Sequence, residues 1–240
     1  MSHLQLQPRR AFQAARILAS DPDDLPQVFT IIESLSADTL HRIASRMQKS
    51  EGGRRLLASR PDIVQLLADR AALAKLPEGS LGRAYLAFVE REKISAEGIR
   101  AAATKGMSSA WETLPEPLDF VHARMRDTHD LWHAVTGYSG DVLGEAALLA
   151  FIFAQTWNPG IAFILGIAMT KTIRSKIGDG PEARRTIVDG FRRGKKAAWL
   201  PGQEWESMLA LPLEEVRRKL NVGPPAIYRE VRSSELKAAA

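Results

Sequence analysis

The sequence predicts an all-α protein, a multi-helix bundle of one domain, and three observations support this fold class. No run of alternating β-branched residues indicates a strand, while Ala, Leu, Arg and Glu are abundant throughout. Proline, glycine and N-cap residues divide the chain into segments of helical length. No repeat, low-complexity stretch or linker interrupts residues 1–240, so we expect a single domain.

Proline, glycine and N-cap residues indicate where the helices of the first half of the chain begin and end. The segment up to Asp21 lacks the apolar core and cleavage pattern of a signal peptide, so we interpret it as the first helix of a cytoplasmic bacterial protein. Pro61 opens a helix that a Leu-Pro-Glu-Gly-Ser turn ends, and a helix with one apolar stripe follows over 80–94. Ser95 is placed to cap another helix. A proline-rich break then precedes a helix expected over 118–136.

The second half of the chain is divided in the same way. Asp141 follows a glycine turn and is placed to cap a helix that Asn158-Pro159-Gly160 ends. A further helix is expected over 161–177, and a basic helix begins at Gly180-Pro181. The C-terminal part predicts two short helices, the second opened by Pro212.

The stretch from Ala146 to Thr170 is 25 residues long and carries no formal charge. Its length alone would allow a transmembrane helix. Asn158-Pro159-Gly160, however, splits it into two pieces, each shorter than a bilayer requires. A helix that is apolar on all sides usually forms the centre of a bundle. We therefore interpret both pieces as core helices, with membrane insertion or lipid contact as the alternative.

The composition bounds the chemistry and the partners. The chain has no cysteine, which excludes disulfides, thiolate metal ligands and a cysteine nucleophile. Residues 171–196 carry nine Lys or Arg and three acidic residues, more positive charge than the net +5 of the whole chain. Such a face suits a phosphate-bearing ligand or an anionic membrane surface, or it is a solvated helix face. No nucleic-acid-binding motif accompanies it, so nucleic acid is not expected as a partner.

The most informative segment is HDLWHAVTGYSGDVLGE, which contains His129, Asp130, His133 and Glu145. Two histidines spaced i, i+4 lie one turn apart on one helix face, as two imidazoles binding one ion must. Glu145 follows a glycine-containing turn and returns from the next helix. Two imidazoles with one or two carboxylates would hold zinc and leave a position open, which is typical of a catalytic site between two antiparallel helices.

The two carboxylates allow different interpretations. Asp130 shares a helix face with His133 at i+3, so it either binds at the edge of the site or orients an imidazole. A capping-box partner for Asp141 belongs at Gly144, so Glu145 misses that role by one residue. Glu145 also precedes a run of apolar residues, where an inward-pointing carboxylate needs a cation or a strong hydrogen-bond partner.

Other catalytic motifs find little support. Ser108, Ser109 and Ser139 lack a G-x-S-x-G context, and no G-x-G-x-x-G sequence or P-loop occurs. The four residues of the central segment instead match H-D-x-x-H-x11-E. This sequence resembles the fourth protein of coenzyme Q (ubiquinone) biosynthesis, a family to which RDTHDLWH, LAFIFAQ and FRRGKKAAWLPGQEWE are also similar. The resemblance covers roughly residues 10–230.

This resemblance implies an all-α fold, a Zn²⁺ ion held by His129, Asp130, His133 and Glu145, and an apolar cavity accessible to lipid. It implies removal of the C1 carboxylate of a 4-hydroxy-3-polyprenylbenzoate, with Asp130 and Glu145 as the catalytic carboxyl groups. Such ligands would also accept Fe²⁺, and in an oxidative reaction C1 would gain oxygen. The alternative is a non-catalytic prenyl-lipid-binding scaffold that organises other quinone-biosynthesis enzymes around a structural metal.

The resemblance also implies a location and partners. We expect a peripheral protein on the inner face of the bacterial inner membrane, with the helices over 141–157 and 161–177 housing the isoprenoid tail. The basic run would then contact anionic lipid headgroups. Other quinone-biosynthesis proteins and further copies of the same chain, as a homo-oligomer, are the expected protein partners.

Overall fold

A computed structural model describes residues 5–21, 24–36, 38–106, 111, 113–174 and 180–231. These residues form fourteen α-helices and two short 3₁₀ helices, and the extended pairing among them is one isolated bridge, Ser80–Pro212. The all-α fold class is therefore confirmed. The α-helices are α1 (Pro8–Ser20), α2 (Leu25–Leu35), α3 (Thr39–Gln48), α4 (Glu51–Ser59), α5 (Val64–Ala68), α6 (Arg70–Ala74), α7 (Leu81–Glu92), α8 (Ala96–Gly106), α10 (Leu118–Asp127), α11 (His129–Thr136), α12 (Val142–Thr156), α13 (Pro159–Arg174), α14 (Gly180–Lys196) and α15 (Leu213–Leu220), and the 3₁₀ helices are η1 (Leu200–Gly202) and η2 (Trp205–Met208).

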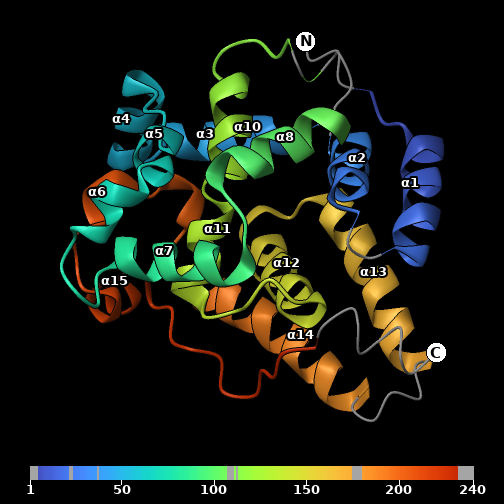
Figure 1. The fold of residues 1–240 in the computed structure, drawn as a ribbon. Helices are drawn as coiled ribbons and strands as arrows, with labels where there is room; N and C mark the ends of the chain where they lie inside the picture. Colours follow the sequence, from blue (N-terminus) through green and yellow to red (C-terminus); the bar gives the residue numbers. More distant parts are fainter. Residues whose placement is uncertain are drawn as a thin grey trace.

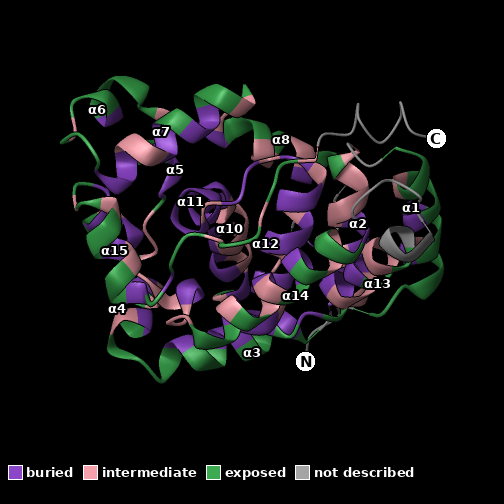
Figure 2. Cartoon of the chain, turned by 90° about the horizontal axis from the view of Figure 1, so that it is seen from below, coloured by how far each residue is buried: buried purple, intermediate pink, exposed green. Residues whose placement is uncertain are grey.

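Helix α12 forms the centre of the molecule. Asp141 caps it as predicted, because its Oδ1 accepts hydrogen bonds from the backbone N–H groups of Leu143 and Gly144 at 3.1 and 3.2 Å. Most α12 side chains are buried, whichever side of the helix they occupy. Helices α11, α13 and α14 pack against α12 (Figure 1). The purple of buried residues is concentrated on α11 and α12 in Figure 2. This packing agrees with the interpretation of the first uncharged piece as a core helix, whereas in the second piece, residues 161–170, the buried residues are Ile161, Ile164 and Leu165.

Two predicted helices are divided in the structure. The helix opened by Pro61 becomes α5 and α6, because Asp69 Oδ1 accepts a hydrogen bond from Ala72 N at 2.9 Å and so caps a new helix. The helix expected over 118–136 becomes α10 and α11, which meet at Thr128. Thr128 lies near the helical region, at φ −93° and ψ −2°, so the chain continues with a small change of course. This change separates the first histidine of the central segment from α10.

Helices α1, α2 and α13 lie side by side at one end of the molecule (Figure 1). A cavity of about 1550 Å³ lies between this group and helices α10 to α12. Pockets for small ligands usually measure ~300–1,000 Å³, so this cavity can take a larger molecule. Within the described ranges, no helix combines the length and the apolar character needed to span a bilayer.

The basic segment does not form one uniform surface. Arg185, Arg192, Lys195 and Lys196 are exposed on α14. Arg193 instead turns inward, where its Nη2 donates to the carbonyl oxygen of Thr136 at 2.7 Å and its guanidinium lies 4.8 Å from the Tyr138 ring centroid. It therefore ties α14 to the end of α11. Lys176, Asp179 and the side chains of Lys171 and Arg174 lie outside the described residues.

Candidate metal centre

Helices α11 and α12 bring together three of the four residues predicted for the site. His129 and His133 lie one turn apart on α11, and Glu145 lies in the first turn of α12. Gly137, with φ at +79°, ends α11 in the left-handed conformation that glycine adopts at no steric cost. The chain then turns through residues 138–141 into α12. A side chain at Gly144 would place Cβ 2.1 Å from the carbonyl oxygen of Ser139, so glycine is required for this close return.

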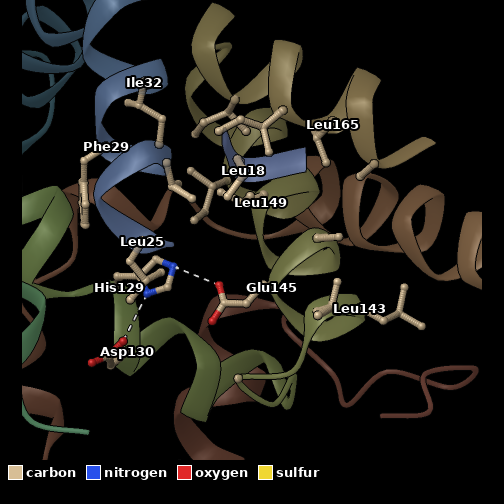
Figure 3. A pocket seen from close by; sticks show the side chains of 18 of the residues that line it. Leu18, Leu25, Phe29, Ile32, His129, Asp130, Leu143, Glu145, Leu149 and Leu165 are labelled. Carbon is tan, nitrogen blue, oxygen red and sulfur yellow. Dashed lines mark hydrogen bonds and ion pairs between the residues drawn. The ribbon is translucent and has the colours of Figure 1, made fainter. Parts of the chain in front are cut away.

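The nitrogen and oxygen atoms of the three residues converge on one point. One ligand atom from each of His129, His133 and Glu145 lies within 4.8 Å of the others. Glu145 Oε1 is 3.2 Å from His133 Nε2, and Glu145 Oε2 is 3.8 Å from His129 Nε2. The His133 side chain is 1% exposed, whereas that of Glu145 is 36% exposed and faces the cavity (Figure 3).

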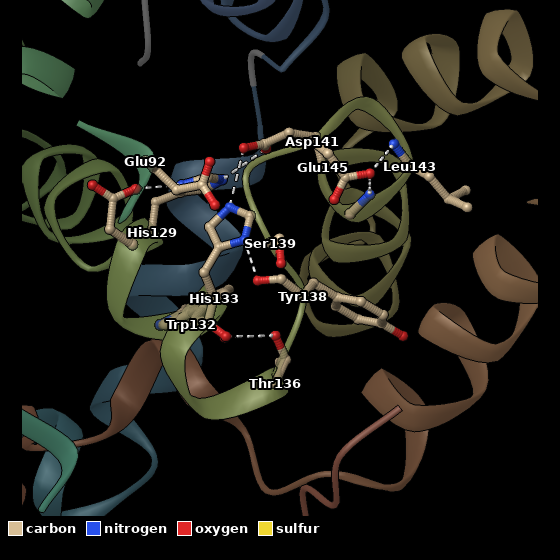
Figure 4. Close-up of polar contacts among 12 residues, drawn as sticks. Glu92, His129, Trp132, His133, Thr136, Tyr138, Ser139, Asp141, Leu143 and Glu145 are labelled. Carbon is tan, nitrogen blue, oxygen red and sulfur yellow. Dashed lines mark hydrogen bonds and ion pairs between the residues drawn. The ribbon is translucent and has the colours of Figure 1, made fainter. Parts of the chain in front are cut away.

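Hydrogen bonds on the far side of each imidazole determine which nitrogen is free. His133 Nδ1 lies 3.0 Å from the backbone carbonyl oxygen of Tyr138, which can only accept, so Nδ1 carries the hydrogen (Figure 4). His129 Nδ1 lies 3.1 Å from Asp130 Oδ1, which fixes this ring in the same way when the carboxylate is ionised. Phe88 stacks on the His133 ring with centroids 4.8 Å apart. Both neutral imidazoles thus direct the Nε2 lone pair at Glu145.

The protonation states of His133 and Glu145 depend on each other. Burial is the largest single influence and lowers the pKa of His133, but the charge and the hydrogen bond of Glu145, with smaller contributions from Asp130 and the Tyr138 carbonyl, together raise it. Burial alone would raise the pKa of Glu145, but the positive charge of His133, and then that of His129, lowers it. The geometry therefore favours a positive charge between the imidazole and the carboxylate.

The donor set fits a divalent metal ion. Two imidazole nitrogens and a carboxylate face one another, and the polar neighbour of the buried His133 Nε2 is Glu145 Oε1 at 3.2 Å. Such a set needs positive charge between its members, and either a proton on His133 or a metal ion supplies it. Two histidines and one carboxylate are ligands that zinc and ferrous iron share, with positions left open for a further ligand.

The sequence left two roles open for Asp130, metal ligand or orienting partner of an imidazole, and its position in the structure favours the second. Its carboxylate contacts His129 Nδ1, and it lies outside the group of three converging residues (Figure 3). It also lines the cavity. We therefore treat Asp130 as the partner that orients His129, while its role as a ligand stays a prediction.

Replacing Asp130 with asparagine is expected to weaken metal binding by about 10- to 100-fold, the usual effect of losing an outer carboxylate partner. The amide of the new side chain could still contact the ring, but it would no longer hold Nδ1–H by charge. Titration against a competing chelator measures the affinity. Unchanged affinity would contradict the orienting role, and a loss as complete as that caused by removing His133 would make Asp130 a ligand.

A C-terminal segment that sequence reasoning missed holds the turn between α11 and α12. The Tyr228 hydroxyl contacts Asp141 Oδ2, and Val231 N donates to Asp141 Oδ1 at 2.7 Å. Ser139 donates from its backbone N to the Tyr228 hydroxyl at 3.1 Å and from its Oγ to Glu230 Oε1 at 2.5 Å. Asp141 is therefore more than a helix cap. No local pattern indicates this contact, because about ninety positions separate the partners.

The cavity reaches two of the three converging residues. His129 and Glu145 line it together with Asp130, whereas the buried His133 is not part of its wall. The remaining wall is largely apolar, and Leu25, Phe29, Ile32, Leu149 and Leu165 point into it (Figure 3). An elongated apolar molecule could thus lie in the cavity with one end at the histidines.

Comparison with known proteins identifies the family. A model of the coenzyme Q (ubiquinone) biosynthesis protein Coq4 family matches residues 7–226. The chain belongs to this family. Curated relatives include the mitochondrial ubiquinone biosynthesis proteins coq4 of Aspergillus clavatus, 31% identical over 198 residues, and COQ4 of Podospora anserina, 31% identical over 200 residues. These alignments cover 80% and 82% of this chain but 64% and 62% of the relatives, so the chain spans a little under two thirds of their length.

A solved structure supports the fold assignment. The crystal structure of a protein from Nostoc punctiforme PCC 73102 matches with a TM-score of 0.67 and 23% sequence identity. The match covers 91% of this chain and all of the Nostoc chain. At this level of identity the similarity establishes the shared fold. The sequence-based family resemblance is thus confirmed, and the predicted metal and reaction go beyond what these relatives establish.

Proposed function

We propose that this protein acts in ubiquinone biosynthesis by removing the C1 carboxylate of a 4-hydroxy-3-polyprenylbenzoate at a membrane surface. The observation that carries the proposal is the junction of two features in one cavity. Two of the metal-binding side chains, His129 and Glu145, form part of its wall, and the remaining wall is largely apolar. The proposed substrate likewise has a polar part, the aromatic head, and an apolar part, the long isoprenoid tail.

His129, His133 and Glu145 would hold the metal, with Asp130 orienting His129. A bound Zn²⁺ or Fe²⁺ ion supplies positive charge that attracts the substrate carboxylate and stabilises charge developing on the ring. The apolar wall excludes water from the head group, which strengthens every electrostatic interaction there.

The carboxyl groups of the site have a second task in this reaction. When the bond between C1 and the carboxylate breaks, CO₂ leaves and C1 must take up a proton. Glu145 and Asp130 are the two carboxyl groups that the cavity wall places next to the histidines. Glu145 is the better exposed to the cavity, so we assign to it the transfer of a proton to C1. Its carboxylate would take this proton from solvent water and pass it on, while the two histidines would keep the metal in place.

The membrane surface is proposed from apolar side chains on α1 and α2. Leu18, Ser20 and Leu25 line the cavity where α1 and α2 approach each other, and Phe12 and Ile17 of α1 are exposed nearby in the sequence. A polyprenyl substrate resides in the bilayer, and exposed apolar side chains next to the cavity-lining residues of α1 suit contact with it. The exposed cations of α14 would add attraction to anionic headgroups.

The direct test is CO₂ release from 3-polyprenyl-4-hydroxybenzoate by the metal-loaded protein. We expect stoichiometric CO₂ and the decarboxylated phenol, and we expect chelation of the metal to stop the reaction. Glu145→Gln should slow turnover by about 100-fold or more, a typical contribution of a general acid or base. A hydroxylated product would indicate the oxidative reaction instead.

The rival function is a prenyl-lipid-binding scaffold, in which the metal merely ties α11 to α12. That function is supported if the wild-type protein binds the substrate and releases no CO₂, or if Glu145→Gln fully restores quinone synthesis in cells that lack the protein.

A further inference from the structure

Arg126 lies on the cavity wall beside the metal centre. His122, Met125, Arg126 and His129 all line the cavity. They follow one another at helical spacing on α10 and the start of α11, so they share one face of this continuous helical path. Asp130, four positions after Arg126, lines the same wall. This face therefore places Arg126 on the cavity wall one helical turn before His129.

The Arg126 guanidinium is fixed on one side and free on the other. Its Nε donates to Asp127 Oδ1 at 2.7 Å, and the second oxygen of this buried carboxylate is occupied by Arg100 Nη2 at 2.6 Å. The two terminal nitrogens of Arg126 have no acceptor among the described residues, although its side chain is 13% exposed. A sheltered guanidinium with unused donors is suited to an anionic ligand.

Arg126 differs from the other cations of the described cavity wall. Arg70, Lys93 and Arg229 are exposed, and Arg70 Nη2 already donates to the carbonyl oxygen of Ile94 at 2.8 Å. His122 adds no charge at neutral pH, because burial, and then the charge of Arg126, lowers its pKa to about 4. Arg126 is thus the sheltered cation of this wall.

We propose that Arg126 binds the carboxylate of the aromatic substrate and thereby selects acids over uncharged analogues. This inference rests on the proposed function for the identity of the ligand, a prenylated benzoate. The planar guanidinium can hold both carboxylate oxygens with two parallel hydrogen bonds. The hydrogen bond to Asp127 fixes the plane of the group before the substrate arrives. Arg126 acts as a binding and positioning residue, and the proton transfer belongs to Glu145.

The test compares two probes, 3-geranylbenzoate and its methyl ester, by equilibrium binding to the full chain as purified. The probes lack the 4-hydroxyl group that activates the ring, so they are bound without being converted. The wild-type protein should prefer the acid. Arg126→Gln should weaken binding of the acid by about 10- to 100-fold, the value of a charged hydrogen-bonded pair, and leave the ester unchanged. Arg126→Lys keeps the charge but cannot donate two parallel hydrogen bonds, so its affinity for the acid should lie between those of the wild-type protein and Arg126→Gln.

Arg70→Gln is the matched control, because it removes a cation from the same cavity wall that is exposed and already engaged. It should leave the preference for the acid intact. The proposal is overturned if Arg126→Gln keeps the preference, if acid and ester weaken equally, or if Arg70→Gln has the same effect. Failure of the proposed function looks different: no CO₂ is released by the wild-type protein, while the preference for the acid persists.

Discussion

Replacing His133 with alanine is expected to remove bound metal and turnover together. The imidazole supplies the more deeply buried of the two Nε2 lone pairs, 3.2 Å from Glu145 Oε1. Phe88, which stacks on the His133 ring, is apolar and cannot replace it as a ligand. The loss should exceed the ~10- to 100-fold effect of removing an outer partner such as Asp130. Elemental analysis gives the metal per chain, and CO₂ release gives the turnover.

His122→Ala is the control for this prediction. His122 lines the same cavity and packs edge-on against Trp111 with ring centroids 5.1 Å apart, outside the converging group. The variant should retain the metal. Stoichiometric metal in His133→Ala, or equal metal loss in both variants, would remove the site at His129, His133 and Glu145 as the place where the metal binds.

The converging residues were predictable because their geometry is local. The i, i+4 spacing of His129 and His133 defines one helix face, and the turn that follows returns Glu145 to it. The predicted helix cap at Asp141 is confirmed. Glu145 is not part of that cap, as the spacing predicted, and its carboxylate contacts His133 instead. Helical periodicity and turn chemistry act over a few residues, so one sequence is sufficient to reveal them.

The supporting contacts could not be predicted in this way. The partner of His133 Nδ1 is the backbone carbonyl of Tyr138, and every residue has such a group. Tyr228 reaches Asp141 only after the chain has passed through α13, α14 and α15. The breaks at Asp69 and Thr128 reflect local hydrogen bonding that competes with a longer helix. The local sequence allows several conformations at these positions, and the packing of distant parts of the chain determines which one forms.

Replacing Gly190 with alanine is expected to cause the largest loss of stability among single-methyl additions to α14. A Cβ at this position would lie 2.3 Å from the carbonyl oxygen of Ala147, and one at Gly194 would lie 2.5 Å from that of Phe151. The two glycines, one turn apart, let the backbones of α14 and α12 approach closely. Because the obstructing atoms are backbone, the helices must separate. We expect the upper end of the ~1–3 kcal/mol typical of overpacking, or a melting temperature lower by about 6–12 °C.

Gly166→Ala on α13 is the matched control, since a Cβ there meets no atom within 4 Å. It should stabilise the protein slightly, by up to ~1 kcal/mol, because alanine favours the helix. Gly190→Ala should also weaken metal binding, because Ala147 lies two residues after Glu145 and a displaced α12 moves that carboxylate away from the histidines on α11. Thermal unfolding and chelator titration on the same sample measure both effects. An unchanged metal affinity despite lower stability would show that the first turn of α12 is held by Asp141 and Tyr228 rather than by its packing on α14.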